Sequence, residues 1–247
     1  SIILFYFIFI FSFSLALASS SSLSLSKVTF DTSDFLSLQR GAKSFFEDCA
    51  GCHSIKYVRY KSLAEGLRVV DGSTDNKEIL GSFVKKNWTF DAANINENIV
   101  SSLSKDDAVK WFGKVPTDLS LVTKFRGSNW VYSYLKSFYF DNSKQWKMNN
   151  LIYPDVAMPN VFIDKQGLQE FYHDSSSGKT SLILTKAGTM SVEGFDKFTY
   201  DLVNFLTYIG EPSKSERTQF GYIFLPFLII FIICTYYLKK EIWKEIN

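Results

Sequence analysis

Two cysteines and a histidine stand together in one five-residue stretch, Cys49-Ala50-Gly51-Cys52-His53. This C-x-x-C-H pattern is typical of the covalent attachment of a c-type haem. The two thiols lie about one helical turn apart, because a helix takes ~3.6 residues per turn. Both can therefore form thioethers with the vinyl groups of one porphyrin, while the imidazole that follows is offered to the iron.

Other chemistries of the same residue types fit this sequence less well. The chain has three Cys and two His, so the pattern has a chance expectation on the order of 10⁻⁴ to 10⁻³. A redox dithiol of the thioredoxin kind needs a βαβ context that the sequence does not show. A zinc site needs four ligands, and the sequence holds no second Cys/His pair. The pattern therefore favours a haem.

The second axial ligand must come from a small set of side chains, namely Met148, Met158, Met190 and His173. Met158 is the predicted ligand, because prolines on both sides hold the backbone extended and reduce its entropy. The other methionines are expected at the surface or filling gaps, and His173 is expected to be exposed. Methionine–histidine ligation raises the reduction potential and leaves no open position, which favours electron transfer over oxygen chemistry.

The composition indicates a folded domain with membrane segments. Apolar residues make up 46% and aromatic residues 17% of the 247 residues, which excludes a disordered chain. The net charge of +2 gives no reason to expect a nucleic-acid partner. Cys234 lies in an apolar run, so no structural disulfide is expected.

Helical patterns place the motif within the globular part. A helix is expected from Ser33-Asp34 to Cys49, carrying the thiols and His53 at its C-terminal end. Gly41 interrupts its apolar face and predicts a close contact with another helix. The other expected elements are a helix from Ser104 to Phe112, a helix from Asp118 to Phe140 kinked at 126–129, a polar loop over Lys144–Asn150, a short hairpin within 161–191, and a helix from Gly194 to Ile209.

The two ends of the chain are apolar. Residues 1–18 predict a signal peptide, with a retained N-terminal hydrophobic segment as the alternative, and residues 19–30 a Ser-rich linker. Residues 31–212 form the expected haem domain, 213–219 a polar linker and 220–238 a transmembrane helix. The tail 239–247 is basic and should stay in the cytoplasm, or on the matrix side. The haem domain is then expected in the periplasm of a bacterial inner membrane, or alternatively in the mitochondrial intermembrane space.

Several further stretches carry a resemblance to a known family. They are Arg40-Gly41-Ala42 before the motif, Tyr57-Val58-Arg59-Tyr60 after it, Trp111-Phe112-Gly113, Pro116-Thr117-Asp118-Leu119-Ser120, Arg126-Gly127, Tyr153-Pro154 through Met158-Pro159, and Asp201 to Leu206 through Gly210-Glu211-Pro212. With these motifs in order over roughly residues 35–245, the chain resembles the cytochrome c1 family, the haem subunits of cytochrome bc1 complexes (complex III). The motifs look more like the proteobacterial branch than the animal mitochondrial one.

The resemblance implies a mainly α, class I-like c-type cytochrome domain with long insertions and one C-terminal membrane helix. It implies one haem c on Cys49 and Cys52, with His53 and Met158 as iron ligands. By the same resemblance, Pro116 packs beside the haem, Arg126 pairs with a propionate, and Trp130 lies near the haem edge. Thr117 departs from the family, which usually has a second proline there.

The implied activity is electron transfer without bond-making, as a subunit of ubiquinol:cytochrome c oxidoreductase. One electron would pass from the Rieske iron–sulfur protein to cytochrome c, beside cytochrome b, within a dimeric complex in membrane lipid. Two alternatives remain at this stage: a stand-alone membrane-anchored cytochrome shuttle, and a haem subunit of another respiratory oxidase.

Overall fold

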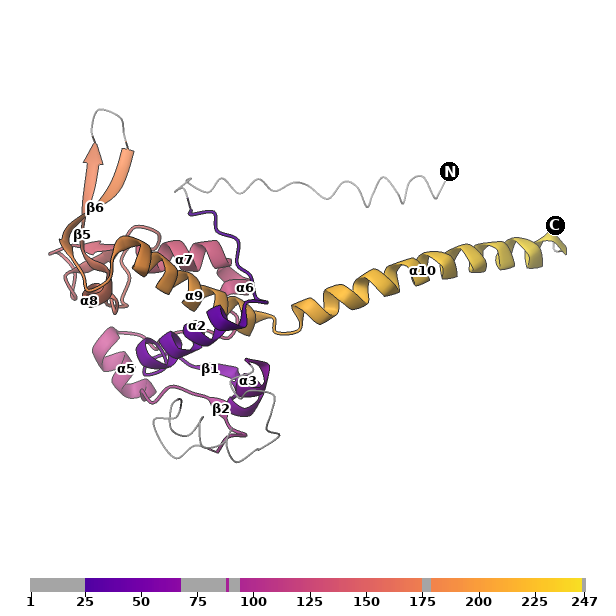
Figure 1. Cartoon of the computed structure of the whole chain (residues 1–247), viewed down its shortest axis with the longest axis horizontal. Coiled ribbons are helices and arrows are strands. Elements are labelled where there is room, and N and C mark those ends of the chain that lie inside the picture. The colour runs from indigo at the N-terminus through magenta and orange to yellow at the C-terminus, as the bar shows by residue number, and fades with distance from the viewer. Residues whose placement is uncertain (1–24, 68–87, 89–93, 175–178, 246–247) are drawn as a thin grey trace.

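The computed structural model describes residues 25–67, 88, 94–174 and 179–245 (Figure 1). The expected signal peptide and residues 19–24 of the Ser-rich linker lie outside these residues. Over the described part the chain is mainly helical, with two small sheets and one long C-terminal helix. This agrees with the expected mainly α class and its long C-terminal helix.

Two helices packed face to face form the centre of the domain, α2 (Phe35–Asp48) and α9 (Val192–Gly210). Asp34 caps α2 by accepting the N–H of Ser37 at 3.0 Å, as the sequence predicts. A Cβ on Gly41 would lie 2.0 Å from the carbonyl oxygen of Asp201 on α9. The predicted close helix contact at Gly41 is therefore confirmed, and it brings the rings of Phe45 and Phe205 to 5.7 Å.

Short elements after α2 form one side of the domain. They are β1 (Ile55–Arg59), α3 (Tyr60–Gly66), β2 (Asn98–Ile99), which pairs antiparallel with β1, and α5 (Lys105–Phe112). Ser104 caps α5 by accepting the N–H of Asp107 at 3.1 Å. This helix ends at Gly113, in a left-handed conformation with φ of 73°, which glycine adopts without strain.

The helix predicted over residues 118–140 is wrong in its extent. The structure has α6 (Val122–Arg126), a break at Gly127 with φ of 90°, and α7 (Ser128–Lys136). The following aromatic residues form strand β3 (Phe138–Phe140). The break was predicted, but pairing with residues 148–150 and with Glu170 makes the last part a strand.

A four-stranded sheet occupies the end of the domain away from α3, in the order β4-β3-β5-β6. Its strands are β3, β4 (Met148–Asn150), β5 (Gly167–Asp174) and β6 (Lys179–Ala187), with α8 (Ile163–Gln166) before β5. The predicted hairpin is confirmed as β5–β6. The polar loop predicted over residues 144–150 is wrong at its end, because β4 pairs with β3 and is buried.

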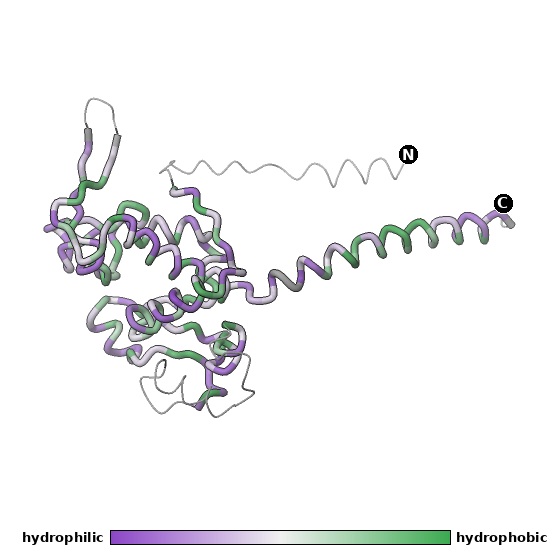
Figure 2. The backbone as a smooth tube through the Cα atoms, in the orientation of Figure 1, coloured by the Kyte–Doolittle hydropathy of each residue, from purple (hydrophilic) through white to green (hydrophobic). Residues whose placement is uncertain are grey.

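The C-terminal helix α10 (Lys214–Ile242) extends away from the domain and is followed by the 3-10 turn η1 (Trp243–Glu245). It is the one helix among the described residues that is long and apolar enough to cross a membrane, over Arg217–Ile242. Figure 2 shows its apolar middle between polar ends. Residues 214–219, expected as a linker, are the first turns of this helix.

Candidate functional site

The motif residues form a compact turn directly after α2, here called the thiol turn (residues 49–53). The N–H of Cys49 donates to the carbonyl of Phe45 at 2.9 Å, continuing the hydrogen bonding of the helix. The carbonyl of Cys49 then accepts from Cys52 at 3.0 Å and from His53 at 2.8 Å. Both thiols and the imidazole are thus carried by one hydrogen-bonded turn on a rigid helix, as the spacing predicts.

The two thiols are free and differ in their environments. Burial raises the pKa of Cys49 to about 12, and the neighbouring Asp48 carboxylate adds to the shift. Cys52 is exposed. Redox dithiols of the C-x-x-C kind work through a cysteine whose pKa is lowered. The pKa of Cys49 is shifted the opposite way, which argues against a redox dithiol.

His53 is held with one ring nitrogen free. Its Nδ1 lies 2.7 Å from the carbonyl oxygen of Thr117, and a carbonyl only accepts, so Nδ1 carries the proton. Burial lowers the pKa of His53, against the opposing effect of this hydrogen bond. The lowered pKa favours the neutral imidazole, in which the Nε2 lone pair is available to a metal.

The segment that supports His53 is fastened to the strand after the thiol turn. Leu119 N–H donates to the carbonyl of Ser54 at 2.8 Å. The side chain of Asp118 accepts the N–H of Lys56 at 3.0 Å, and that of Ser120 accepts the N–H of Tyr57 at 3.2 Å. These bonds fix the carbonyl of Thr117. Pro116, which the family resemblance places beside the haem, is half-buried one residue earlier. The sequence did not identify Thr117 as the acceptor.

Met158 lies in an irregular segment, here called the methionine loop (residues 151–160). The hydroxyl of Tyr134 on α7 donates to its sulfur, with Oη and Sδ 3.4 Å apart. The loop is fastened by Asn150, which is fully buried and whose Oδ1 accepts the N–H groups of Ile152 at 2.9 Å and Tyr153 at 3.0 Å. Its Nδ2 donates to the carbonyl of Tyr134 at 2.8 Å. One side chain thus positions both Met158 and its partner.

Arg126 and Trp130 belong to the same group of side chains as Met158. The guanidinium carbon of Arg126 lies 5.0 Å from the ring centre of Trp130 and 5.8 Å from that of Tyr153. Trp130 in turn stacks on Tyr134 at 5.1 Å and 7°. Arg126 is exposed, and a guanidinium packed on a ring keeps its edge N–H donors for an anion.

Two groups of predicted site residues are therefore each internally connected: the thiol turn with Thr117, and Met158 with Tyr134, Trp130 and Arg126. Cys49, Trp130 and Tyr134 all pack against the same hydrophobic core. Residues 117–126 join the groups along the chain, because the segment that supports His53 leads into α6.

The donor set fits a c-type haem. It consists of two thiols in one turn, a neutral imidazole with a free nitrogen, a thioether and a guanidinium beside aromatic rings. In the part of the chain that the structure describes, no three His, Cys, Asp or Glu residues gather as a metal site. An iron between His53 and Met158 would need its other ligands from a group that carries them, as a porphyrin does.

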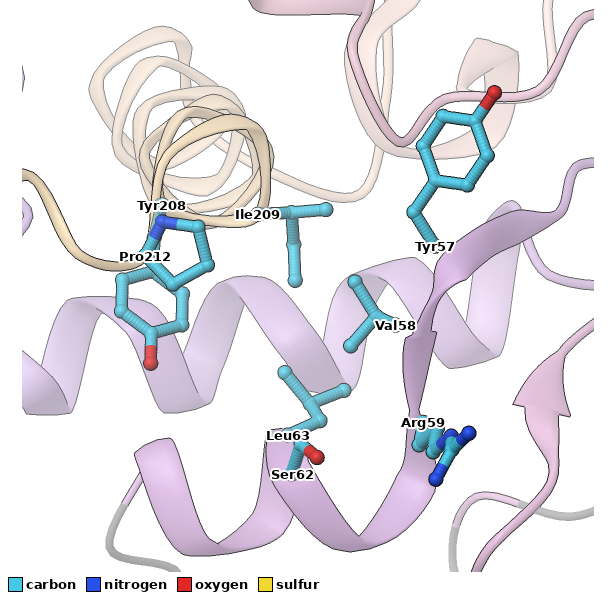
Figure 3. A pocket seen from close by; sticks show the side chains of 8 residues that line it. All are labelled: Tyr57, Val58, Arg59, Ser62, Leu63, Tyr208, Ile209 and Pro212. Atoms are coloured by element: carbon cyan, nitrogen blue, oxygen red, sulfur yellow. The ribbon is translucent and has the colours of Figure 1, made fainter.

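The remaining candidate ligands lie in other settings. Met148 is buried in β4 with 7% of its surface exposed, and Met190 packs partly buried against the core. His173 is exposed on β5, as expected. A cavity of about 340 Å³ lies between β1, α3 and the end of α9, where Val58, Leu63 and Ile209 face one another (Figure 3). Its lining includes none of the cysteines, His53 or Met158, so it is separate from this site.

Known proteins resemble this chain over most of its length. A model of the cytochrome C1 family matches residues 25–246. The chain is 41% identical to cytochrome c1 of Allochromatium vinosum over 226 residues, which cover 89% of this chain and 88% of the relative. It is 37% identical to the ammonia monooxygenase gamma subunit of Nitrosomonas europaea over 221 residues, 90% and 88% of the two chains. A cytochrome b/c1 of Bradyrhizobium diazoefficiens is 24% identical over 244 residues, 87% of this chain and 34% of the relative.

Proposed function

The chain belongs to the cytochrome c1 family, of the proteobacterial type, and we propose that it takes one electron from a Rieske iron–sulfur protein and passes it to a cytochrome c. The observation that carries this proposal is the hydrogen bond from His53 Nδ1 to the Thr117 carbonyl at 2.7 Å. It leaves a neutral, oriented imidazole next to two free thiols. In this family, such an arrangement suits the binding of a covalently attached haem.

Each site residue has a defined task in this proposal. Cys49 and Cys52 would hold one haem c through thioether bonds, with His53 and Met158 as the axial ligands. When bound, the haem supplies a one-electron couple at high potential. Pro116 restricts the backbone before Thr117. The guanidinium of Arg126 would bind a propionate through its permanent charge and its planar set of N–H donors. The ring of Trp130 packs against this guanidinium, with 5.0 Å between the guanidinium carbon and the ring centre.

The charges beside the membrane helix support one side of the membrane for the haem domain. Lys239, Lys240 and Lys244 follow the apolar part of α10, and such residues stay on the cytoplasmic side. The haem domain would then face the periplasm, or the intermembrane space in a mitochondrion. Cytochrome b would lie beside α10 in the same dimeric complex, which the relative named cytochrome b/c1 supports.

A second candidate function is that of a haem subunit in a different redox complex. The Nitrosomonas europaea relative, named as an ammonia monooxygenase gamma subunit, supports it, since it covers 90% of this chain at 37% identity. The same cofactor and the same site would serve there, and only the partner subunits would differ.

Purification of the intact membrane complex in mild detergent tests the proposal. The expected result is a reduced-minus-oxidised c-type spectrum in a preparation that also contains cytochrome b and Rieske subunits. Replacement Met158→Leu should remove the far-red band of methionine-ligated ferric haem and lower the potential sharply, whereas Met190→Leu should change neither. Co-purification with other redox subunits would favour the second candidate, and an unchanged Met158→Leu spectrum would refute the ligand assignment.

A further inference from the structure

Tyr134 is the residue in direct contact with the sulfur of Met158, and its hydroxyl has no assigned role. We propose that Tyr134 is a positioning residue whose hydrogen bond to the Met158 thioether raises the reduction potential of the haem. This inference rests on the proposed function, because it takes Met158 to be an iron ligand. It assigns a role to a side chain that neither the motif nor the charge pattern of the sequence indicates.

The phenol of Tyr134 is held on several sides, so its hydroxyl has a fixed direction. Its ring stacks on Trp130 at 5.1 Å and meets Phe138 edge-on at 5.3 Å and 68°. Its carbonyl accepts from Asn150 at 2.8 Å. A tyrosine hydroxyl keeps its proton at physiological pH, so it acts as the donor in this contact.

The two partners of the Tyr134–Met158 contact are both supported by one buried side chain, that of Asn150. Asn150 binds the backbone of Tyr134 through Nδ2 and the start of the methionine loop through Oδ1. The start of the loop and α7 are therefore joined through one side chain, and this supports the contact of 3.4 Å between Tyr134 Oη and Met158 Sδ. A hydrogen bond that happened to form between two loose side chains would lack this common support.

The electronic effect follows from the chemistry of a thioether. Its sulfur has two lone pairs, so one can accept the phenol hydrogen while the other is given to a metal. The hydrogen bond withdraws electron density from the sulfur and makes it a weaker donor. Oxidised iron depends more on donation than reduced iron does, so the reduced state gains relative to the oxidised state and the potential rises.

The test compares Tyr134→Phe with Tyr132→Phe in the full membrane-anchored protein with its haem attached. Tyr132 lies on the same helix, and its hydroxyl accepts from Lys136 at 3.3 Å instead of contacting Met158. Tyr134→Phe keeps the stacked ring and removes only the hydroxyl. We expect a lower midpoint potential with an unchanged low-spin spectrum, while Tyr132→Phe keeps the wild-type potential.

A second readout separates tuning from simple loosening of the site. With its hydrogen bond removed, the sulfur binds oxidised iron more tightly, so added imidazole should displace Met158 less readily. The apparent dissociation constant of imidazole should rise by about three- to tenfold, the range given by the net strength of an ordinary hydrogen bond. A merely structural role predicts the opposite sign, because a loosened methionine is displaced more easily.

Site-specific 3-fluorotyrosine at position 134 supplies an independent variant with the same shape. Its more acidic hydroxyl should strengthen the hydrogen bond and raise the potential. Tyr134→Phe and the fluorinated residue must therefore shift the potential in opposite directions. An unchanged potential in both, or easier displacement by imidazole in Tyr134→Phe, would overturn the inference. These results leave the proposed function intact, whereas an unchanged Met158→Leu spectrum would refute the ligand assignment itself.

Discussion

The thiol turn and the methionine loop are held in place by different means. The thiol turn continues the backbone hydrogen bonding of α2, and His53 is directed by a backbone carbonyl. The methionine loop has no regular structure and is held by side chains, above all Asn150 and Tyr134. Backbone contacts tolerate most substitutions, whereas each side-chain contact is lost with one replacement. The loop should therefore be the more vulnerable half of the site.

Replacing Asn150 with Ala should produce the largest effect. Its side chain accepts hydrogen bonds from Ser137, Ile152 and Tyr153 and donates one to Tyr134. All four partners would lose a contact that is buried or half-buried. We expect a loss of about 3 kcal/mol of stability, since an unsatisfied buried group costs ~1–3 kcal/mol and water can reach the less buried partners. Denaturant unfolding measures the loss of stability. The far-red band reports whether Met158 still binds the iron of the proposed haem.

Asn129→Ala is the matched control for this prediction. Asn129 accepts a single hydrogen bond, from the N–H of Val28 at 2.9 Å, so about 1 kcal/mol should be lost. The haem that we propose on Cys49 and Cys52 should remain covalently attached in both variants, because both cysteines lie in the thiol turn that continues α2. Loss of the covalent haem in Asn150→Ala alone would contradict the separation of the two regions.

The same contrast explains which features the sequence could predict. The thiol turn follows from a local pattern: an N-cap at Asp34, an apolar face and a spaced pair of cysteines, all within 20 residues (53 − 34 + 1). Asp34, Gly41 and Ser104 behave as predicted because caps and close contacts have local signatures. Met158 was predicted from its flanking prolines, but those prolines do not predict its contact with Tyr134 or the hydrogen bonds of Asn150.

The features missed by the sequence depend on contacts between distant segments. Residues Phe138–Phe140 continue the apolar pattern of a helix, but pairing with Met148–Asn150 makes them a strand. Thr117 contributes a carbonyl, which every residue type carries, so no pattern could identify it. Asn150 reads as part of a polar loop, although it is fully buried. Tertiary context decided all three.

The scaffold of the thiol turn can be broken by adding one methyl group at Gly41. A Cβ there would lie 2.0 Å from the carbonyl oxygen of Asp201 and 2.6 Å from the Cβ of Phe205, so α2 must move away from α9. Overpacking of this kind should cost about 2–3 kcal/mol, less the gain of up to ~1 kcal/mol in helix propensity of Ala over Gly. Thermal unfolding of the detergent-solubilised chain measures the net loss.

Gly51→Ala is the control, because a Cβ at Gly51 would meet no atom within 4 Å. It lies inside the thiol turn itself, yet its stability should stay within about 0.5 kcal/mol of the wild type. If Gly51→Ala were the more damaging change, the turn would depend on its own backbone freedom and not on the packing of α2.

The ion pair between α2 and α9 gives a smaller, pH-dependent effect. Burial raises the pKa of Asp201, but hydrogen bonds from Arg40 and Ser37 outweigh it and lower the pKa overall below 3.8. A lowered pKa stabilises the fold above the unfolded value, and this stability is lost as the pH falls through the folded pKa. Arg40→Ala should lower the free energy of unfolding by about 1–2 kcal/mol at pH 7. Breaking a fully buried ion pair costs ~3–5 kcal/mol, but the Arg40 side chain is 45% exposed, and solvent weakens the pair.

The difference in the free energy of unfolding between Arg40→Ala and the wild type should therefore shrink below about pH 4, where the Asp201 carboxylate is protonated in the unfolded chain. Urea unfolding at pH 7 and at acid pH measures it. Lys43→Ala is the control on the same helix, since its pair with Glu47 at 3.8 Å is exposed and should contribute no more than about 0.5 kcal/mol. A constant difference across this pH range would show that Arg40 acts by packing alone.

Thr117→Val should have the smallest effect, although Thr117 contacts His53 directly. The contact uses the carbonyl, which Val retains, and the Thr117 side chain is exposed. Potential and spectrum should equal those of the wild type, and stability should change by less than about 0.5 kcal/mol. On the other side of the proposed haem, removal of one hydroxyl from Tyr134 should shift the potential. Equal shifts from Thr117→Val and Tyr134→Phe would mean that both ligands depend on side chains, and the distinction between the thiol turn and the methionine loop would fail.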